Sequence, residues 1–486
     1  MLTVFLMTTV LYNIPVKAQA TIKIGIIGPV GLPHWEPAGM KPAAEMARDE
    51  INIAGGVDVG GEYRNIELVF ANEYALPEPD PIKAQEEIRK LIVDEECEFI
   101  IGGFRTEVTG PMIEVAMEYH VPFFIDGAAT TELISDTVGI DYAKYKYLFR
   151  NMPPNVTSLL KTTGGAIRLK IDQMKDVFGT ETIKVAVQVE DLAWMDLGYN
   201  VLRTNYNNIL GDYAEVVTSD RIPEDSVDCA TWLQKVTDND ARIIIHMFSG
   251  RVGAYYIAQW HTMEVNATPV GINVLAQLET HWADTDGGCE YETLMNSVGT
   301  RTPITPLSVG FWDNFVSYTG VWPIYTAFGA YDSVYGLKEA IETAGTTDPD
   351  ALVPVLEAQE RDTVVGKFKY TADHDVFVNS LYDTWPEPRY GRAFMVQWQA
   401  GKMEVVYPID QPFSKEWKLP PWMVGEEPSK PGDFDGDGDI DFWDILAFVD
   451  AYRAAPGTVD PRADFDDDGD IDFWDILAFV DYYRAG

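Results

Sequence analysis

The feature that most constrains the fold is a regular alternation of short apolar runs with longer segments whose apolar residues recur at helical spacing. Six of the runs have the length and composition of buried strands, at residues 22–28, 66–70, 99–103, 121–127, 183–190 and 241–248. Between the first two, Met40, Ala44 and Ile51 share one helix face. Strands separated by helices of this length form parallel sheets with right-handed crossovers. The alternation therefore predicts an α/β chain with two lobes.

The first twenty residues have the pattern of a secretory signal. An apolar run extends from Leu2 to Leu11, and Ala18-Gln19-Ala20 supplies the small residues of a cleavage site. An anchor helix is the alternative, although the run is short for a bilayer. We predict that residues 1–20 are a signal peptide and that the mature chain is extracytoplasmic, at the cell surface or secreted.

Composition excludes some partners. The 486 residues carry a net charge of −41, which repels nucleic acid and anionic membrane surfaces. The three cysteines Cys97, Cys229 and Cys289 are few for a secreted protein. A Cys229–Cys289 bridge and buried thiols both remain open.

Catalytic chemistry has little support in the sequence. The six His residues form no HExxH pair, and no Cys/His metal spacing, GxSxG elbow or phosphate-cradling glycine loop is present. We therefore predict that the protein is not an enzyme.

Hydroxyl side chains follow two of the predicted strands. Residues 104–110 read FRTEVTG and residues 127–131 read GAATT, each just before a helix. Ligands of open α/β sheets bind beyond the carboxyl ends of the strands, and hydroxyls and free N–H groups at helix N-termini can hold a carboxylate or carbonyl oxygen. Ordinary helix capping is the alternative.

Four segments resemble the first lobe of type I periplasmic binding proteins, and in particular the leucine/isoleucine/valine-binding family of ABC transporters. They are NIAGGVDVGG (52–61), IIGGFRTEVT (100–109), VPFFIDGAATTEL (121–133) and YLFRNMPPN (147–155). Residues 330–352 and 366–375 resemble later elements of that family. The resemblance covers roughly residues 21–420.

The resemblance implies two doubly wound parallel sheets, joined by three crossovers and closing over one ligand. Lobe 1 would comprise about residues 21–149 and 300–385, and lobe 2 about residues 150–299 and 386–420. A small polar solute would be captured and passed to an ABC permease.

The resemblance also implies a set of ligand-binding residues. Thr106 matches the serine that binds the ligand carboxylate, and Ala128 and Thr130 match the family's AAT turn. The remaining matched positions are Trp35, Trp194 and Ser249. Tyr325 and Phe328 could add to an apolar lining.

One departure concerns the ligand ammonium, which the family binds with a carboxylate of lobe 2. Residues 270–277 read VGINVLAQ and offer Asn273 and Gln277 but no acid. A neutral amide pairs weakly with an ammonium, because charge-assisted hydrogen bonds are about twice as strong as neutral ones. Either Glu190 or Asp191 substitutes, or the ligand is an amide or another small polar molecule rather than an amino acid.

The chain ends in two nearly identical acidic segments, which follow a Pro-rich linker at residues 421–431. Each segment places Asp at loop positions 1, 3, 5, 7, 9 and 12 and Gly at position 6, as calcium loops of EF-hand type do. The ligands predicted for two Ca²⁺ sites are Asp433, Asp435, Asp437, Asp439, Asp441 and Asp444, and Asp464, Asp466, Asp468, Asp470, Asp472 and Asp475. A solvated acidic tail, the alternative, explains neither the fixed glycine nor the apolar helix that follows.

Each repeat is a loop followed by a helix, without the entering helix of an EF-hand. This duplicated half-motif resembles a type I dockerin domain over residues 432–486, a small all-α calcium-binding fold. The resemblance implies a cohesin-like surface partner, read by Phe442, Trp443, Phe473 and Trp474 at loop positions 10 and 11. These aromatic residues could instead complete the small core.

The sequence as a whole predicts an exported solute-binding protein with a calcium-dependent attachment module. The alternative is a structural or adhesive surface protein whose lobes no longer bind a solute.

Overall fold

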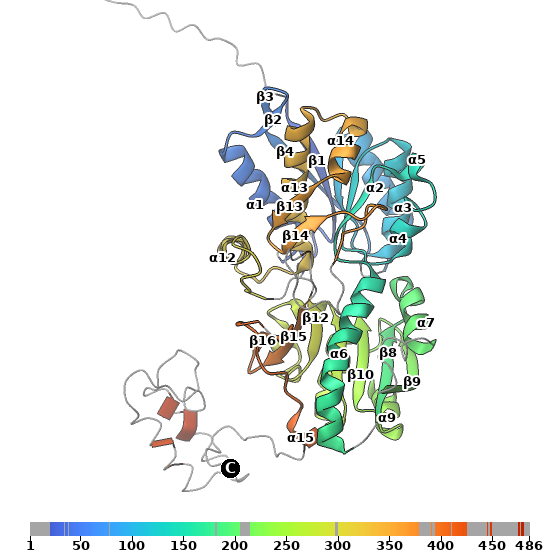
Figure 1. Cartoon of the computed structure of the whole chain (residues 1–486), viewed down its shortest axis with the longest axis vertical. Helices are drawn as coiled ribbons and strands as arrows, with labels where there is room; N and C mark the ends of the chain where they lie inside the picture. The colour runs from blue at the N-terminus through green and yellow to red at the C-terminus, as the bar shows by residue number, and fades with distance from the viewer. Residues whose placement is uncertain are drawn as a thin grey trace, which may run out of the picture. The chain divides into compact units, whose positions relative to one another are not determined.

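The computed structural model describes residues 20–33, 35–36, 38–76, 78–179, 182–204, 214–296, 300–378, 390, 394–409, 411–424, 445, 448–449, 475–476 and 478–480. The chain divides into two compact units, Met1–Trp417 and Lys418–Gly486. The larger unit contains two large sheets, each the centre of one lobe (Figure 1).

The sheet of lobe 1 is parallel throughout, in the order β4-β1-β5-β6-β7. Its strands are β1 (Ile22–Gly28), β4 (Ile66–Asn72), β5 (Phe99–Gly102), β6 (Phe123–Asp126) and β7 (Leu148–Met152). Strands β5 and β6 are fully buried, and in β1 only Lys23 is partly exposed, as expected where helices cover both faces of a parallel sheet.

Helices α1 and α13 of lobe 1 pack on each other, and so do α2 and α3. The helices of this lobe are α1 (Met40–Ile53), α2 (Pro81–Val93), α3 (Thr106–Glu118), α4 (Glu132–Ser135), α5 (Tyr142–Tyr145), α12 (Ser308–Thr319), α13 (Tyr325–Ala344) and α14 (Pro349–Glu357). Two hairpins complete it, β2 (Val57–Val59) with β3 (Glu62–Arg64), and β13 (Glu360–Thr363) with β14 (Gly366–Lys369).

The sheet of lobe 2 has the order β16-β15-β12-β11-β10-β8-β9, with β15 antiparallel to both neighbours. Its strands are β8 (Ile183–Glu190), β9 (Ala214–Ile222), β10 (Ile243–Phe248), β11 (Thr268–Asn273), β12 (Thr293–Asn296), β15 (Phe394–Gln399) and β16 (Lys402–Tyr407). Its helices are α6 (Val156–Phe178), η1 (Ala193–Met195), α7 (Asp196–Thr204), α9 (Ala230–Asp238), α10 (Val252–Thr262), η3 (Leu275–Gln277) and α11 (His281–Asp284).

The chain passes between the two lobes at three places in the element order: between β7 and β8, between β12 and α12, and between β14 and β15. The first passage runs through α6, where the side chain of Asn155 accepts from Ser158 N and Gly179 ends the helix in a left-handed conformation. The predicted α/β fold with parallel sheets is therefore confirmed. Because the chain crosses between the lobes more than once, the two lobes belong to one compact unit.

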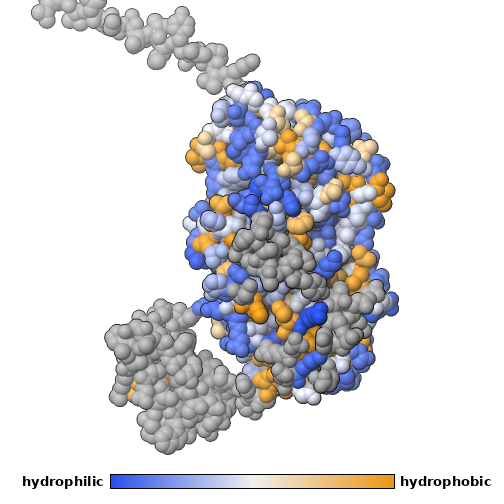
Figure 2. Space-filling model, in the orientation of Figure 1, coloured by the Kyte–Doolittle hydropathy of each residue, from blue (hydrophilic) through white to orange (hydrophobic). Residues whose placement is uncertain are grey.

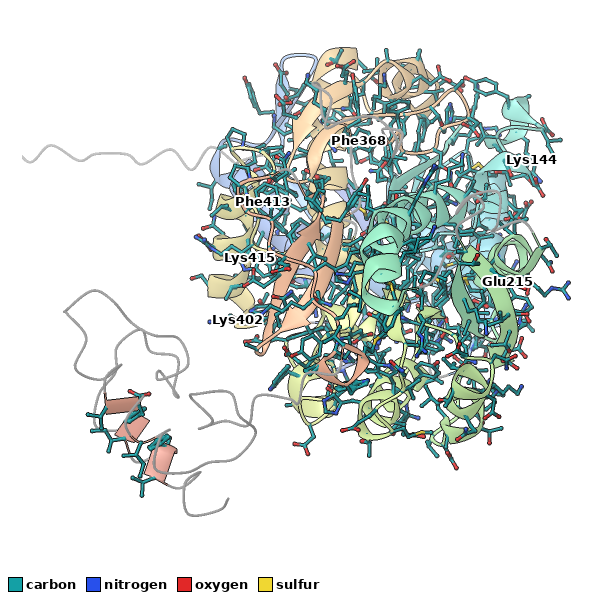
Figure 3. The ribbon with its side chains drawn as sticks, turned by 60° about the horizontal axis from the view of Figure 1, so that its bottom comes forward. Lys144, Glu215, Phe368, Lys402, Phe413 and Lys415 are labelled. Carbon is teal, nitrogen blue, oxygen red and sulfur yellow. The ribbon has the colours of Figure 1, made fainter. Side chains whose placement is uncertain are left out.

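The last part of the large unit folds back on lobe 2 (Figure 3). The Phe413 ring lies 6.2 Å from the Phe394 ring between centroids. Lys415 N donates a hydrogen bond to Val405 O at 2.7 Å. These contacts fix residues after β16 against the antiparallel edge of the sheet.

Four tryptophans form a continuous series of ring contacts. Trp312 of α12 contacts Trp322, Trp322 contacts Trp398 of β15, and Trp398 contacts Trp282 of α11, each pair with centroids 6.2 Å apart. Trp322 and Trp398 are nearly parallel, at an interplanar angle of 20°. This middle contact joins the lobe 1 segment between α12 and α13 to the sheet of lobe 2.

All three cysteines are buried and unpaired, so Cys229 and Cys289 form no bridge.

The described surface has a mixed character. On the face drawn in Figure 2, the described hydrophobic residues are interspersed with hydrophilic ones. Across the residues that the structure describes, no helix is long and apolar enough to cross a membrane.

In the smaller unit, the structure describes α15 (Pro421–Val424) and a few residues of each repeat. Phe448 and Phe479, which occupy equivalent positions in the two repeats, stack with centroids 4.5 Å apart and an interplanar angle of 4°. Asp475 is buried. The other eleven predicted calcium ligands and the four aromatic residues Phe442, Trp443, Phe473 and Trp474 lie outside the described residues.

Candidate ligand-binding cleft

A cleft with about 590 Å³ of empty space, including the part open to solvent, lies between the two lobes. Lobe 1 and the first crossover contribute Phe104, Arg105, Thr106, Glu107, Gly127, Ala128, Ala129, Pro153, Leu159 and Tyr325 to its lining. Lobe 2 contributes Trp194, Ser249, Ile272, Val274, Gln277 and Met295. Most of these side chains are apolar, and a few polar groups stand among them, as is typical of small-molecule sites.

Two loops at the carboxyl ends of β5 and β6 form the lobe 1 wall. Ala128 N donates to Gly103 O at 2.8 Å, which holds the loops side by side. Gly127 has φ +148°, and a Cβ there would lie 2.5 Å from Phe104 Cα. Only glycine permits this approach, because any side chain would collide with the neighbouring loop.

Two predicted ligand residues meet in this wall. The hydroxyls of Thr106 and Thr130 are hydrogen-bonded at 2.5 Å, although they come from different loops. Thr106 lines the cleft, whereas Thr130 is buried behind it. A hydroxyl pair of this kind can orient a donor from Thr106 toward a ligand oxygen.

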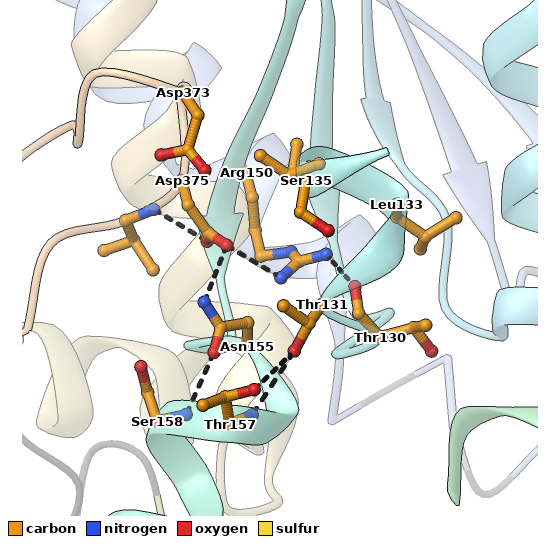
Figure 4. Close-up of polar contacts among 12 residues, drawn as sticks. Thr130, Thr131, Leu133, Ser135, Arg150, Asn155, Thr157, Ser158, Asp373 and Asp375 are labelled. Atoms are coloured by element: carbon orange, nitrogen blue, oxygen red, sulfur yellow. Dashed lines mark hydrogen bonds and ion pairs between the residues drawn. The ribbon is translucent and has the colours of Figure 1, made fainter. Parts of the chain in front are cut away.

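A buried arginine supports the Thr130 loop from behind (Figure 4). Arg150 of β7 is 0% exposed, and its Nη2 donates to Thr130 O. Its Nη1 donates to Asp375 Oδ2 at 3.1 Å. Burial lowers the pKa of Arg150, and the charge of Asp375 opposes this shift.

The same network reaches the first turn of α6. Asp375 Oδ2 also accepts from Asn155 Nδ2 at 2.9 Å, and Asn155 caps α6. Val156 N donates to Ala129 O at 2.7 Å, and the hydroxyls of Thr131 and Thr157 bond at 3.0 Å. The ligand-facing loop is thus fixed to the start of the first crossover.

The lobe 2 wall contains Trp194 and Ser249, as predicted. Both donate hydrogen bonds to Glu190 Oε1, and Gly250 N donates to Glu190 Oε2 at 3.1 Å. Glu190 is 0% exposed. Burial raises the pKa of Glu190, and the hydrogen bonds from Ser249 and Trp194 and the charge of Arg105 oppose this rise. The carboxyl therefore orients Trp194 and Ser249 from behind the lining.

Asn273 lies on the other side of its strand. Its neighbours Ile272 and Val274 line the cleft, whereas the Asn273 side chain is buried and donates from Nδ2 to Glu292 Oε1 at 2.8 Å. Successive side chains of a strand point to opposite faces, so Asn273 does not reach the cleft in this arrangement. Asp191, the other candidate for the ammonium, pairs with Arg221 at 2.5 Å.

Glu292 is the centre of a buried polar cluster in lobe 2. Its Oε2 bonds His281 Nε2 at 2.8 Å, and its Oε1 lies 3.3 Å from His246 Nε2. Burial would raise the pKa of Glu292, but the attraction of His281 and His246 outweighs it and lowers the pKa to about 2. Nothing in the sequence pattern identified this cluster, because its members come from β10, from α11 and from the residue just before β12.

Trp35 also lies outside the cleft lining. Its ring packs on Phe104, with centroids 5.0 Å apart, and against an apolar cluster that includes Leu275 and Leu278 of lobe 2. Phe328 is buried and absent from the lining, whereas Tyr325 lines the cleft. Trp35 therefore contributes to the contact between lobes beside the cleft.

Polar contacts across the cleft hold the lobes in a closed arrangement. Arg105 Nη2 donates to Glu224 Oε2 at 2.8 Å, and Ala193 N donates to Glu107 Oε1 at 3.0 Å. Tyr325 N donates to Gln277 Oε1 at 3.3 Å. Arg105 and Glu107 are the sequence neighbours of Thr106, a predicted ligand-binding residue. This adjacency is the only sequence feature that pointed to a place for them at the cleft.

The described residues contain no group of three or more His, Cys, Asp or Glu side chains that could hold a metal ion. The predicted calcium loops lie almost entirely outside this part of the chain. The cleft itself presents hydroxyl, amide, guanidinium and carboxylate groups that can bind a small molecule.

Comparison with solved structures shows the same fold. A putative branched-chain amino acid ABC transporter protein from Silicibacter pomeroyi is 19% identical, with a TM-score of 0.67, 83% of this chain covered and 100% of that chain. A branched-chain amino acid transporter substrate-binding protein from Streptococcus pneumoniae in complex with isoleucine is 18% identical, with a TM-score of 0.62 and coverages of 80% and 99%. A solute-binding protein from R. palustris in complex with benzoate is 17% identical, with a TM-score of 0.63 and coverages of 80% and 96%.

Among curated proteins, none matches this chain. The family model described as periplasmic binding protein matches residues 21–384, which is most of the chain and includes both walls of the cleft. The chain belongs to the periplasmic binding protein family, whose members work outside the cytoplasm.

Proposed function

We propose that the large unit captures a small carboxylate with an apolar body and delivers it to an ABC permease. The observation that carries this proposal is the division of the cleft lining. Thr106 and the backbone of the Ala128 loop stand at one wall, and apolar side chains form most of the rest. Two similar structures hold isoleucine and benzoate, both of which combine a carboxylate with an apolar group.

The carboxyl groups near the cleft argue against a strong requirement for an ammonium. Glu190 is occupied by three donors, and Asp191 is paired with Arg221. Glu107 is the exception, because its Oε2 is buried without a hydrogen-bond partner in the described structure. An amino acid would have to place its ammonium at Glu107, whereas a simple carboxylic acid needs no such contact.

A matched series of solutes tests both parts of the proposal. Leucine, 4-methylpentanoate and 4-methylpentanamide share one apolar body and differ in the ammonium and the carboxylate. We expect titration calorimetry to show the tightest binding for 4-methylpentanoate and the weakest for the amide, with benzoate as a second carboxylate. Tighter binding of leucine would assign the ammonium to Glu107. If none of the four raises the melting temperature, the structural or adhesive alternative gains support.

We propose in addition that residues 432–486 form a calcium-dependent docking module of dockerin type for a cohesin-like partner. Two acidic loops with the EF-hand ligand pattern support the proposal. The stacking of Phe448 on Phe479 pairs equivalent positions of the two repeats. The burial of Asp475, the predicted last ligand of the second loop, suits a carboxylate that closes a metal site.

Calcium titration of the full chain tests this module. We expect two Ca²⁺ per chain, and Asp475→Ala should remove one of them and weaken the other, because the two helices share one small core. Asp460→Ala, an acidic residue between the predicted loops, is the matched control. A full-length protein that binds no calcium, or an Asp475→Ala variant that binds as the wild type does, would contradict the proposal.

A further inference from the structure

One ion pair joins the two lobes beside the cleft. Arg105, just before α3 in lobe 1, donates to Glu224, which follows β9 in lobe 2, at 2.8 Å. The side chains of Arg105 and Glu224 are 4% and 27% exposed. Because the guanidinium is almost completely removed from water, its attraction to a carboxylate is stronger than that of an ion pair on an open surface.

A second carboxylate of lobe 2 approaches the same guanidinium. A Cβ built on Gly250 would lie 3.6 Å from Arg105 Nη2, 3.7 Å from Glu190 Oε2 and 3.8 Å from Glu224 Oε2. All three charged groups therefore lie close to one point of lobe 2. The single cation from lobe 1 faces two acids in the opposite lobe.

Glu190 and Glu224 differ in the hydrogen bonds that they would keep if the lobes separated. Glu190 has three donors within lobe 2, from Trp194, Ser249 and Gly250. Glu224 has no hydrogen bond in the described structure other than the one from Arg105. Arg105 would keep its contact with Ala75 O, at 3.4 Å within lobe 1. Of these side-chain hydrogen bonds of Arg105, Glu190 and Glu224, the bond between Arg105 and Glu224 joins the two lobes, so it exists only while the lobes are closed.

We propose that Arg105 and Glu224 form a latch that holds the lobes closed without any contribution from a solute. The latch sets the fraction of solute-free protein that is closed, and hence the fraction whose cleft is accessible. The measured binding free energy of a ligand therefore includes the free-energy difference between the open and closed forms of the solute-free protein. The inference does not depend on which solute the cleft binds.

The test uses solute-free full-length protein with one spin label on each lobe. Ile82→Cys on α2 and Val227→Cys in lobe 2 are suitable positions, being 70% and 63% exposed, whereas the native cysteines are buried. Distances between the labels are measured for the wild type, for Glu224→Gln and for Arg105→Lys. Glu224→Gln should raise the ratio of open to closed molecules by about tenfold or more, as expected when one partner of a buried charge pair is lost.

Asp240→Asn is the matched control, because Asp240 pairs with Arg242 at 2.8 Å and with Lys184 at 3.4 Å entirely within lobe 2. It should leave the distances unchanged. Arg105→Lys keeps the charge but loses the planar guanidinium, so it should open the protein less than Glu224→Gln does. An unchanged distance distribution in Glu224→Gln, or an equal shift in Asp240→Asn, would overturn the latch. The result is independent of the solute titrations, since no solute is present.

Discussion

The two walls of the cleft use polar residues in opposite ways. In lobe 1, Thr106 reaches the cleft surface and Thr130 supports it from behind, with Arg150 behind the loop. In lobe 2, the acids lie out of reach of the cleft: Glu190 is covered by its donors, and Glu292 is in the core. The lobe 1 wall therefore presents side-chain hydrogen-bonding groups at the cleft surface, and the lobe 2 wall mainly presents apolar groups.

This difference shows that a charged side chain close to a binding site is not always free to bind a ligand. A buried carboxylate with several donors has its hydrogen-bonding capacity filled, and it stabilises the protein wall instead. Two buried acids, Glu73 of lobe 1 and Glu292 of lobe 2, differ in the direction of their pKa shifts, which is upward for Glu73 and downward for Glu292.

Glu292→Ala should produce the largest change, by removing the acceptor that His281, His246 and Asn273 share. Loss of one member of a buried charged cluster costs about 3–5 kcal/mol. The pKa of Glu292 is lowered to about 2 from 4.5, so its stabilising effect is present above pH 4.5 and is lost as the pH falls toward 2. Urea unfolding at pH 7 and pH 3 checks both statements.

Glu279→Gln, on the exposed surface of the same lobe, serves as the control and should change the free energy of unfolding by less than about 0.5 kcal/mol. If Glu292→Ala were as stable as this control, the buried cluster would not support the lobe 2 wall.

Glu73→Gln should change the pH dependence of lobe 1. Glu73 is fully buried and accepts from Phe104 N at 2.7 Å. Burial raises its pKa from 4.5 to about 8, so the folded state keeps a proton that the unfolded chain releases. Its contribution is present below pH 4.5 and is lost as the pH rises through 8, by about 2–3 kcal/mol between pH 5 and pH 7.

Urea unfolding of the wild type and of Glu73→Gln at pH 5, 6 and 7 measures this effect. The variant should lose less stability across the series than the wild type does. Parallel pH profiles for the two proteins would show that Glu73 is ionised in the folded state.

Thr106→Ala should produce the smallest of these changes, and in binding rather than in folding. Leaving a ligand oxygen without its donor costs about 1–3 kcal/mol. Titration with 4-methylpentanoate compares the wild type, Thr106→Ala and Thr106→Ser, and the serine variant should recover most of the affinity because it keeps the hydroxyl. Equal affinities for all three would remove Thr106 from the contact surface and weaken the distinction between the walls.

The sequence predicted six of the twelve strands in the two large sheets, because buried parallel strands are continuous apolar runs between turns. The resemblance to type I periplasmic binding proteins implied Thr106, Ala128, Trp194 and Ser249 as ligand-binding residues, and all four line the cleft.

Other positions depended on properties that a single sequence does not contain. The buried position of Asn273 depends on which face of β11 is turned away from the cleft. The position of Trp35 depends on how the two lobes pack against each other when they are closed. Glu224 had no signal at all, because its partner Arg105 is 119 residues away in the chain. Nearly all of the calcium loops lie outside the described residues, so the acidic repeats stay a sequence-based prediction.

The contact of Trp322 with Trp398 gives the protein an optical signal of its own. Indole rings nearly parallel at 6.2 Å couple their electronic transitions, which adds intensity to the near-ultraviolet circular dichroism spectrum. Separation of the lobes would break that coupling and expose more of the partly buried Trp322 ring to water, with a shift of its fluorescence to longer wavelength. Stopped-flow fluorescence of the unlabelled chain would then follow lobe movement in real time, in the same solution in which a solute is added.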